Sequence, residues 1–185
     1  MRRSAYAVLS TILAAGVLAA PATARSGDDV TIVDKVVELS GASGFDASSG
    51  DFDILREAVI ATGLDDKLSR NSQVTVFAPT DQAFLDLTGA SSEGEAFAGV
   101  AALGLDKVRQ ILKYHVTPGR IGAKQVVQAK RISTLLKGEE IRKKRGEAVL
   151  KDDTGRKVEI VAPNAAKVSN GVIHVLDGVL LPYEL

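Results

Sequence analysis

The stretch Val74-Thr75-Val76-Phe77-Ala78-Pro79-Thr80-Asp81-Gln82-Ala83-Phe84 decides the fold of this chain. Its first five residues favour a β-strand or are small, and Pro79 ends that strand because it has no N–H for a ladder hydrogen bond. Thr80 can accept a bond from an early helix N–H, and Asp81 then places negative charge in the first turn. The apolar side of this helix is formed by Ala83, Phe84 and Leu87. The stretch therefore predicts a buried strand that turns directly into a helix packed on the core.

Residues 1–24 have the three parts of a secretory signal peptide. Met1 to Ser4 is basic, Ala5 to Ala20 is almost wholly apolar, and Ala22-Thr23-Ala24 has the small-x-small pattern of a signal peptidase site. The apolar run is short for a membrane span, and no second such run follows. We expect cleavage after Ala24, which leaves 25–185 as one exported domain without a transmembrane segment. The pair Arg2-Arg3 keeps a twin-arginine export signal open as an alternative.

The composition excludes several classes of function. The chain has 23 basic and 23 acidic residues, and loss of Arg2 and Arg3 leaves 21 against 23, a net charge of about −2. A charge so close to neutral does not indicate nucleic acid or anionic lipid as a partner. The chain has no cysteine, which excludes thiol catalysis and cysteine-ligated metals. A domain of this length must then be stabilised by burial alone.

Helical periodicity dominates the first half of the chain. Helices are predicted at about 29–39 with Asp29 as N-cap, and at 51–62 with Gly63 as a left-handed C-cap. A further helix is predicted from Asp106 to His115, and Pro118-Gly119 stops it. The small-residue stretch 96–103 is either a loose helix or an irregular cover.

Short strands separated by charged turns follow from about Arg131. Asn170-Gly171 is the strongest two-residue hairpin signal. Val172 to Leu176 has bulky residues at both parities, which indicates a strand covered on both faces, and Val179-Leu180-Leu181 resumes it. Helices first and antiparallel strands later predict a single α+β domain into whose sheet the early strand is recruited.

With both ends in view, the chain resembles the fasciclin-like (FAS1) domain family, as a single-domain secreted bacterial-type member. Residues 75–84 match the first sequence box of the family, residues 170–182 match the second, and Leu112-Lys113-Tyr114-His115-Val116 is similar to its tyrosine–histidine motif. The resemblance implies a wedge of two β-sheets with helices packed around it, and a role in adhesion or matrix contacts. It also implies that the box residues are structural: Thr75, Phe77, Pro79, Thr80, Asp81, Phe84, Asn170, Gly171, His174 and Pro182.

The chain departs from the family pattern just before the second box. Animal adhesion members have an Asp-Ile pair there that is implicated in integrin binding, whereas this chain has Ala165-Ala166. Asp53-Ile54 occurs on the second predicted helix, so it is not the same site. We therefore do not expect integrin-type recognition.

Two hypotheses compete for Tyr114 and His115. The family resemblance implies that they contact a partner. Because His115 lies on the apolar side of a helix, the pattern favours a core histidine whose ring nitrogens bond to Asp81 or to the backbone.

No catalytic or metal-binding motif is present. His115 and His174 are the only histidines, and the second belongs to the strand that we expect to be buried on both faces. The chain has no Gly-x-Ser-x-Gly elbow and no Walker-type loop. Asp152-Asp153-Thr154-Gly155 has too few ligands at calcium-loop spacing and is interpreted as a turn. We therefore expect no catalytic residues, no metal, no cofactor and no enzyme activity.

The only basic cluster in sequence is Arg142 to Arg145, with Lys137 nearby. It fits an anionic glycan or a membrane surface, or else the solvated tip of a hairpin whose charges discourage edge-to-edge pairing.

The predicted function is a secreted, periplasmic or extracellular, non-enzymatic FAS1 protein that mediates adhesion through a cell-surface or matrix protein or glycan. The alternative is a carrier of an apolar small molecule, carotenoid- or lipid-like, in a groove lined by Ile121, Val126, Val127, Ile132 and Leu135. The oligomeric state is left open.

Overall fold

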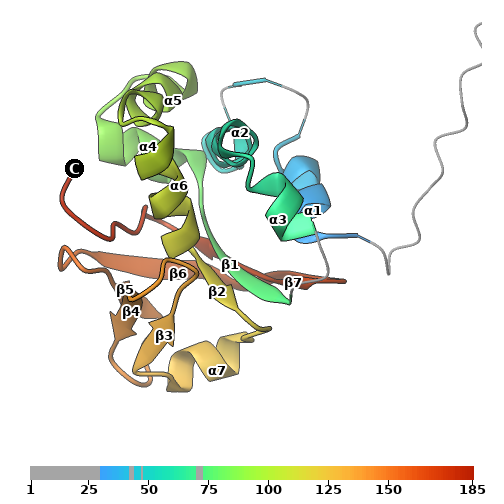
Figure 1. Ribbon diagram of the computed structural model, residues 1–185, viewed down its shortest axis with the longest axis vertical. Coiled ribbons are helices and arrows are strands. Elements are labelled where there is room, and N and C mark those ends of the chain that lie inside the picture. The colour runs from blue at the N-terminus through green and yellow to red at the C-terminus, as the bar shows by residue number, and fades with distance from the viewer. Residues whose placement is uncertain (1–29, 42–43, 47, 70–72) are drawn as a thin grey trace, which may run out of the picture.

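The computed structural model describes residues 30–41, 44–46, 48–69 and 73–185 (Figure 1). The predicted signal peptide and the predicted N-cap Asp29 lie outside these residues. The helices are α1 (Ile32–Leu39), α2 (Asp53–Thr62), α3 (Asp65–Ser69), α4 (Asp81–Thr88), α5 (Glu93–Ala102), α6 (Leu105–Tyr114) and α7 (Ala123–Gln128). The strands are β1 (Val74–Pro79), β2 (Val116–Pro118), β3 (Arg131–Ser133), β4 (Glu140–Lys143), β5 (Val149–Lys151), β6 (Lys157–Val168) and β7 (Gly171–Leu176). The α+β prediction, with helices mostly in the first half and strands in the second, is confirmed.

Strands β1 and β7 form the centre of the sheet, whose order is β2-β1-β7-β6-β5-β4-β3. These two strands are parallel, from Val74 opposite Gly171 to Pro79 opposite Leu176, and all the other neighbours are antiparallel. Every residue of both strands is buried. The pair therefore has layers on both of its faces, as the doubly apolar pattern of Val172 to Leu176 predicted.

Strand β6 joins the two halves of the wedge. Its first residues pair with β5, and the stretch from Ile160 to Val168 pairs with β7 through two register irregularities. Bulges of this kind bend a strand and increase its twist. The sheet curls so far that its end strands approach each other, and the Leu135 N–H, just beyond β3, donates to the Val116 carbonyl of β2 at 2.7 Å.

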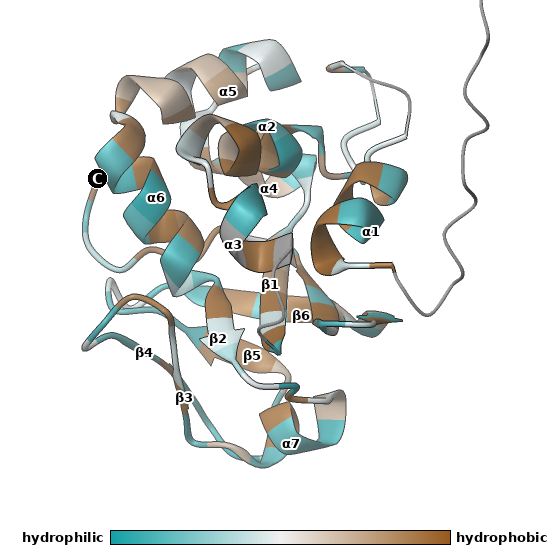
Figure 2. Cartoon of the chain, turned by 45° about the vertical axis from the view of Figure 1, so that its right-hand side comes forward, coloured by the Kyte–Doolittle hydropathy of each residue, from teal (hydrophilic) through white to brown (hydrophobic). Residues whose placement is uncertain are grey.

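The curl creates two hydrophobic cores. The larger core lies between the sheet and helices α1 to α6, which cover one side of it (Figure 1). The alternation of apolar and polar segments along α1 and α6 in Figure 2 matches this one-sided burial. The smaller core fills the inside of the curl and includes Phe77, Tyr114, Ile141 and Leu176.

The corner between β1 and α4 lacks the capping hydrogen bond that was predicted for Thr80. Thr80 is the N-cap of α4, but its side chain makes no capping hydrogen bond. Asp81 instead turns its carboxylate to the start of α2 and accepts from the Asp53 and Ile54 N–H groups at 2.8 and 2.9 Å. The first box therefore joins two helices that are 28 residues apart in sequence.

The turn between β6 and β7 also differs from its prediction. Val168 and Gly171 are cross-strand partners, so the two turn residues are Ser169 and Asn170. Asn170 accepts from the Ile32 N–H at 2.9 Å and donates to the Leu68 carbonyl, so its side chain connects α1 and α3 to the turn. Gly171 is a strand residue beside the Val74 carbonyl.

Two local predictions were wrong, and two helices were not predicted. Helix α1 begins with Thr31 as N-cap, which forms a capping box with Asp34. Helices α3 and α7 were not predicted. Residues Val179 to Leu181 are buried but do not continue β7 as a strand. The left-handed C-cap at Gly63 is confirmed, with φ of 64°.

None of the helices in the described part of the chain is long and apolar enough to cross a membrane.

Candidate functional site

Tyr114 is enclosed by the curled sheet. Its side chain is fully buried in the smaller core, and its hydroxyl lies 3.3 Å from the Glu140 carbonyl and 3.2 Å from Asp153 Oδ2. Burial, and then the negative charge of Asp153, raises the pKa of Tyr114 well above its ordinary value. The ring is thus a neutral, hydrogen-bonded part of the core.

His115 is buried, and both of its ring nitrogens are hydrogen-bonded. Nε2 accepts from the Leu180 N–H at 3.0 Å, so the ring proton is on Nδ1, which donates to the Ile111 carbonyl at 2.8 Å. Burial lowers the pKa of His115 to about 4, and the imidazole is neutral at pH 7. Its partners are backbone groups and not Asp81. The partner-binding role of Tyr114 and His115 stays a prediction, and it would need a partner that reaches two covered rings.

His174 has the same kind of environment. Its Nδ1 accepts from the Asn164 N–H at 3.1 Å, so Nε2 carries the proton and donates to the Ile121 carbonyl at 2.8 Å. The imidazole also stacks on Phe77, with ring centroids 5.5 Å apart. Burial lowers the pKa of His174 below its ordinary value. Neither histidine therefore has a ring nitrogen left for a metal ion or a reacting proton.

Most box residues lie in the interior. Thr75 donates to the Gly119 carbonyl at 2.7 Å and accepts from the Ile121 N–H at 2.8 Å, which ties β1 to the chain after β2. Asp152, in the turn beside the second box, accepts from the Leu181 N–H at 3.0 Å and from two groups of its own turn. Of the ten box residues, all except the half-buried Thr80 are buried.

Exposed cations form a continuous row on the outer face of the curled sheet, opposite the face that encloses the smaller core. Arg131 lies opposite Arg142, Arg142 opposite Lys151, and Lys151 opposite Lys157, so four neighbouring strands each contribute one cation. We call these four residues the cationic row. Directly paired residues share a face of the sheet, about 4.8 Å apart from strand to strand. All four side chains are exposed. Strands β3, β4 and β5, which carry three of them, lie at the end of the molecule away from α5 (Figure 1).

A pocket of about 420 Å³ lies along this row. We call it the cationic pocket; its lining residues are Arg142, Lys143, Lys144, Glu147, Val149, Lys151 and Lys157. Five of these seven residues are basic and one is acidic. The volume falls within the usual range for small-ligand sites, roughly 300–1,000 Å³. The pocket is thus large enough for a sugar ring with an anionic substituent.

The charges in the pocket are only partly neutralised. Glu147 pairs with Lys144 at 2.8 Å, and the weaker contact of Arg142 with Asp153 spans 3.9 Å. Among the described residues, no carboxylate lies within ion-pair distance of Lys151 or Lys157. These two ammonium groups are therefore available to an external anion.

Lys143 closes the inner side of the pocket. It is 8% exposed, and its ammonium donates to the carbonyls of Val127 and Lys144 at 3.2 and 3.1 Å. Burial lowers the pKa of Lys143. A cation solvated by two carbonyls and facing a pocket adds positive potential to the site.

The cluster predicted from sequence overlaps this site only in part. Arg142, Lys143 and Lys144 belong to it, whereas Arg145 folds back to donate to the Gln128 carbonyl at 3.0 Å. Lys151 and Lys157 were missed because they lie in other strands. Each is adjacent in sequence to a buried aliphatic residue, Leu150 or Val158, and this alternation was the available signal.

A second cavity, of about 170 Å³, lies under the helices. Aliphatic side chains from α1, α2 and α3 line it, together with Val76, Leu112 and the His115 ring. The residues predicted to line an apolar groove lie elsewhere: Val126 and Val127 border an open pocket of about 470 Å³ beside His174, and Ile132 belongs to the smaller core.

Comparisons with known proteins agree with this architecture. Residues 50–182, more than half of the chain, match the family model of the Fasciclin domain. Protein sll1483 of Synechocystis sp. (strain ATCC 27184 / PCC 6803 / Kazusa) is 32% identical over 192 residues, which cover 98% of this chain and 99% of that protein. A FAS1 domain pair from the insect cell adhesion molecule fasciclin I has a similar fold, with a TM-score of 0.58 and 19% identity over 82% of this chain. The chain spans 50% of the length of that domain pair. Its sequence boxes, curled sheet and covering helices place this chain in the fasciclin (FAS1) domain family.

Proposed function

We propose that this protein is a secreted, non-enzymatic adhesion domain that binds acidic glycans of the cell surface or matrix through the cationic pocket. FAS1 domains are generally non-enzymatic and of adhesion type, and they are common in secreted or extracellular proteins. The single observation that carries the proposal is the register of Arg131, Arg142, Lys151 and Lys157 in one row.

The cationic row lowers the stability of the folded protein through charge repulsion. Like charges directly opposite each other in a sheet are destabilising, by a few tenths to about 1 kcal/mol per pair. Three such pairs follow one another here, and they are only partly offset by the ion pairs of Arg131 with Glu140 at 3.5 Å and of Arg142 with Asp153 at 3.9 Å. A bound polyanion would turn the remaining repulsion into attraction. Carboxylate or sulfate groups on adjacent sugars would meet several cations at once. The contact would be polar, exposed and dependent on salt.

Export is part of the same proposal. The signal peptide at residues 1–24 and the mature domain at 25–185 stay predictions from the sequence. They would bring the pocket into the periplasm or the extracellular space, where acidic glycans occur. The net charge of about −2 of the mature chain makes the cationic row a local feature and gives no reason to expect nucleic acid as a partner.

Binding to immobilised glycans tests the proposal. The protein should bind a uronate- or sulfate-bearing polysaccharide saturably, should not bind a neutral one, and should lose affinity as salt increases. The double variant Lys151→Glu/Lys157→Glu should lose most of this affinity. Lys167→Glu is the matched control, because Lys167 is an exposed lysine of β6 whose cross-strand partner is Val172 and which does not line the pocket. Binding that is insensitive to salt, or equally reduced by the control, contradicts the proposal.

The apolar cavity under the helices supports a second candidate function, as a carrier of an apolar molecule. Its volume of about 170 Å³ is close to that of a cavity that accepts a benzene ring, about 150 Å³. It would hold one ring or a short stretch of chain, and the rest of a carotenoid- or lipid-like molecule would extend beyond it. The absorption spectrum and the organic extract of protein purified from its native source test this candidate. A colourless, lipid-free preparation contradicts it.

A further inference from the structure

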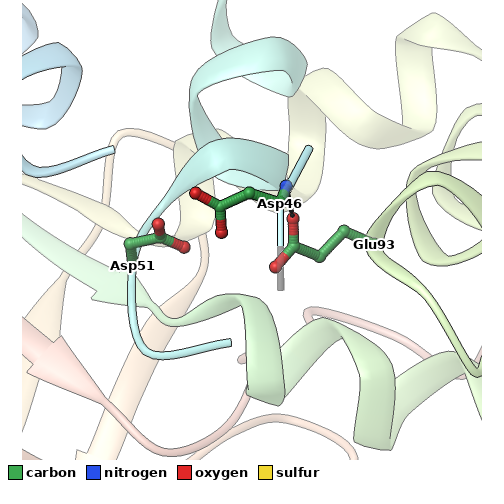
Figure 3. Close-up of side chains that lie close together, drawn as sticks. All are labelled: Asp46, Asp51 and Glu93. Carbon is green, nitrogen blue, oxygen red and sulfur yellow. Dashed lines mark hydrogen bonds between the residues drawn. The ribbon is translucent and has the colours of Figure 1, made fainter. Parts of the chain in front are cut away.

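Five carboxylates gather where the loop before α2 meets the starts of α2, α4 and α5. One oxygen each of Asp46, Asp51 and Glu93 lies within 4.8 Å of the others, and the same holds for Asp51, Asp53 and Asp81. Asp51 belongs to both groups. Figure 3 shows the side chains of Asp46, Asp51 and Glu93 converging on one space.

The inner part of the cluster is buried, and the cluster has little positive charge. Asp53 and Asp81 are fully buried and Glu93 is 4% exposed, whereas Asp51 is half-buried and Asp46 is exposed. Among the described residues, the one cation in ion-pair contact with the cluster is Arg56, whose Nη1 lies 3.0 Å from Asp53 Oδ1. Charges removed from water are costly unless they are paired or coordinate a metal. The arrangement therefore needs protons or a cation.

Three buried oxygens of the cluster make no hydrogen bond among the described residues. They are Asp51 Oδ1 and both oxygens of Asp53, of which Oδ1 faces Arg56 in the ion pair. The fully buried Asp53 carboxylate also has an oxygen close to those of Asp51 and Asp81. Unsatisfied buried acceptors are rare in native proteins, and an ion is one of their standard explanations.

Other oxygens of the cluster accept hydrogen bonds that fix the positions of their carboxylates. Asp81 uses both oxygens on the α2 backbone, and Glu93 Oε2 accepts from the Asp46 N–H at 2.9 Å. The loop is also fixed by backbone bonds from Asp81 N to Asp51 O and from Gln82 N to Ser49 O, at 3.1 and 2.7 Å. The carboxylates would stay close even without an ion.

We propose that Asp46, Asp51 and Glu93, backed by Asp53, form a Ca²⁺ site that joins the loop before α2 to the start of α5. The ligands are all hard oxygens, and they come from a loop and a helix start. Ca²⁺ accepts six to eight oxygens in flexible geometry, including bidentate carboxylates, whereas Mg²⁺ requires near-ideal octahedral geometry. Three carboxylates, some of them bidentate, and a few waters would supply the six to eight oxygens that Ca²⁺ accepts. The expected affinity is that of extracellular modules, about 10⁻⁴–10⁻³ M.

Thermal unfolding of the mature domain with EDTA or with 10 mM CaCl₂ tests the site. Ca²⁺ should raise the Tm of the wild type by roughly 3–8 °C, since a ligand that binds only the folded state stabilises it by mass action. MgCl₂ at the same concentration should produce a smaller shift. Titration calorimetry with CaCl₂ should give one site per chain.

The variants Asp51→Asn and Glu93→Gln keep the shape of the side chains and remove one charge each. In EDTA both should melt at or above the wild-type Tm, because a repulsion is removed, and in CaCl₂ both should melt below it. Asp106→Asn is the control, because that side chain is 92% exposed and lies outside the cluster. If the carboxylates instead share protons, Asp51→Asn will lower the Tm in EDTA and CaCl₂ will change nothing, and that result overturns the proposal.

Discussion

The carbonyl oxygen of Val74 lies 2.2 Å from the position that a Cβ atom would take on Gly171. Ile32 Cδ1 is 2.4 Å from the same position. Val74 and Gly171 are partners in the parallel pair of β1 and β7. The absence of a side chain on Gly171 therefore allows the two central strands and α1 to pack this closely. The requirement is for space, since Gly171 is not among the residues with positive φ.

We predict that Gly171→Ala is strongly destabilising. The added methyl meets backbone that cannot move without disturbing both strands, so we expect a loss of about 3 kcal/mol or more in the free energy of unfolding. Urea denaturation measures it. Gly50→Ala is the control, because no heavy atom lies within 4 Å of its Cβ position, and it should change stability by less than about 0.5 kcal/mol. Equal effects of the two variants contradict the close-approach explanation.

A second prediction separates Asp81 from Thr80. Asp81→Ala removes the acceptors of two α2 N–H groups, and should cost about 1–3 kcal/mol of stability. Thr80→Val should cost little, because the Thr80 hydroxyl makes no capping bond. Urea denaturation of both variants in EDTA keeps any Ca²⁺ effect out of the comparison. A larger loss for Thr80→Val would restore the local capping interpretation.

The comparison of Asp81 with Thr80 also shows how far sequence patterns reach. Both residues fit the pattern of a local helix start, and local patterns correctly placed the strand, the helix and the Gly63 cap. The hydrogen-bond partner of Asp81 lies 28 residues upstream, and a local sequence pattern cannot predict a contact over that separation. Asn170 is a similar case, because its side chain bonds to residues 138 and 102 positions away.

The candidate site was incompletely predicted for the same reason. Arg142 to Lys144 form a visible run in sequence, but the cationic row depends on which strands are neighbours and in which register. The acidic cluster combines the loop before α2 with residues from three helix starts. Burial of Tyr114 and His115 depends on the curl of the sheet around them. The sequence shows only that their neighbours are apolar, and it does not show the curl.

The third prediction concerns the pH dependence of stability through His115. Its pKa is about 4 in the folded protein and about 6.5 in an unfolded chain. Between these values the unfolded state binds more protons, so the contribution of His115 to stability falls as the pH falls from about 6.5 to about 4. The full difference corresponds to about 3 kcal/mol.

Comparison with His115→Gln isolates this contribution. Burial raises the pKa of Asp81 to about 8, so its contribution to stability changes with pH in the direction opposite to that of His115. Asp81 is present in both proteins, and its contribution therefore cancels in the difference between them. The wild type should be more stable than His115→Gln at pH 7, and the gap should narrow toward pH 4. Denaturation at a series of pH values measures it, and parallel curves would show that His115 titrates normally.

The last prediction is that the cationic row lowers the stability of the fold that carries it. Lys151→Glu replaces two repulsive cross-strand pairs, with Arg142 and Lys157, by two attractive ones. We expect a gain of about 1 kcal/mol in the free energy of unfolding at low salt, and a smaller gain at 1 M salt, where exposed charges are screened within about 3 Å. Lys167→Glu, opposite Val172, should change stability by less than about 0.5 kcal/mol. The same Lys151→Glu protein should bind an acidic polysaccharide more weakly than the wild type does. A variant that is more stable but binds less well would show that the row is maintained for an external anion, whereas a loss of stability in Lys151→Glu would show that these cations serve the fold.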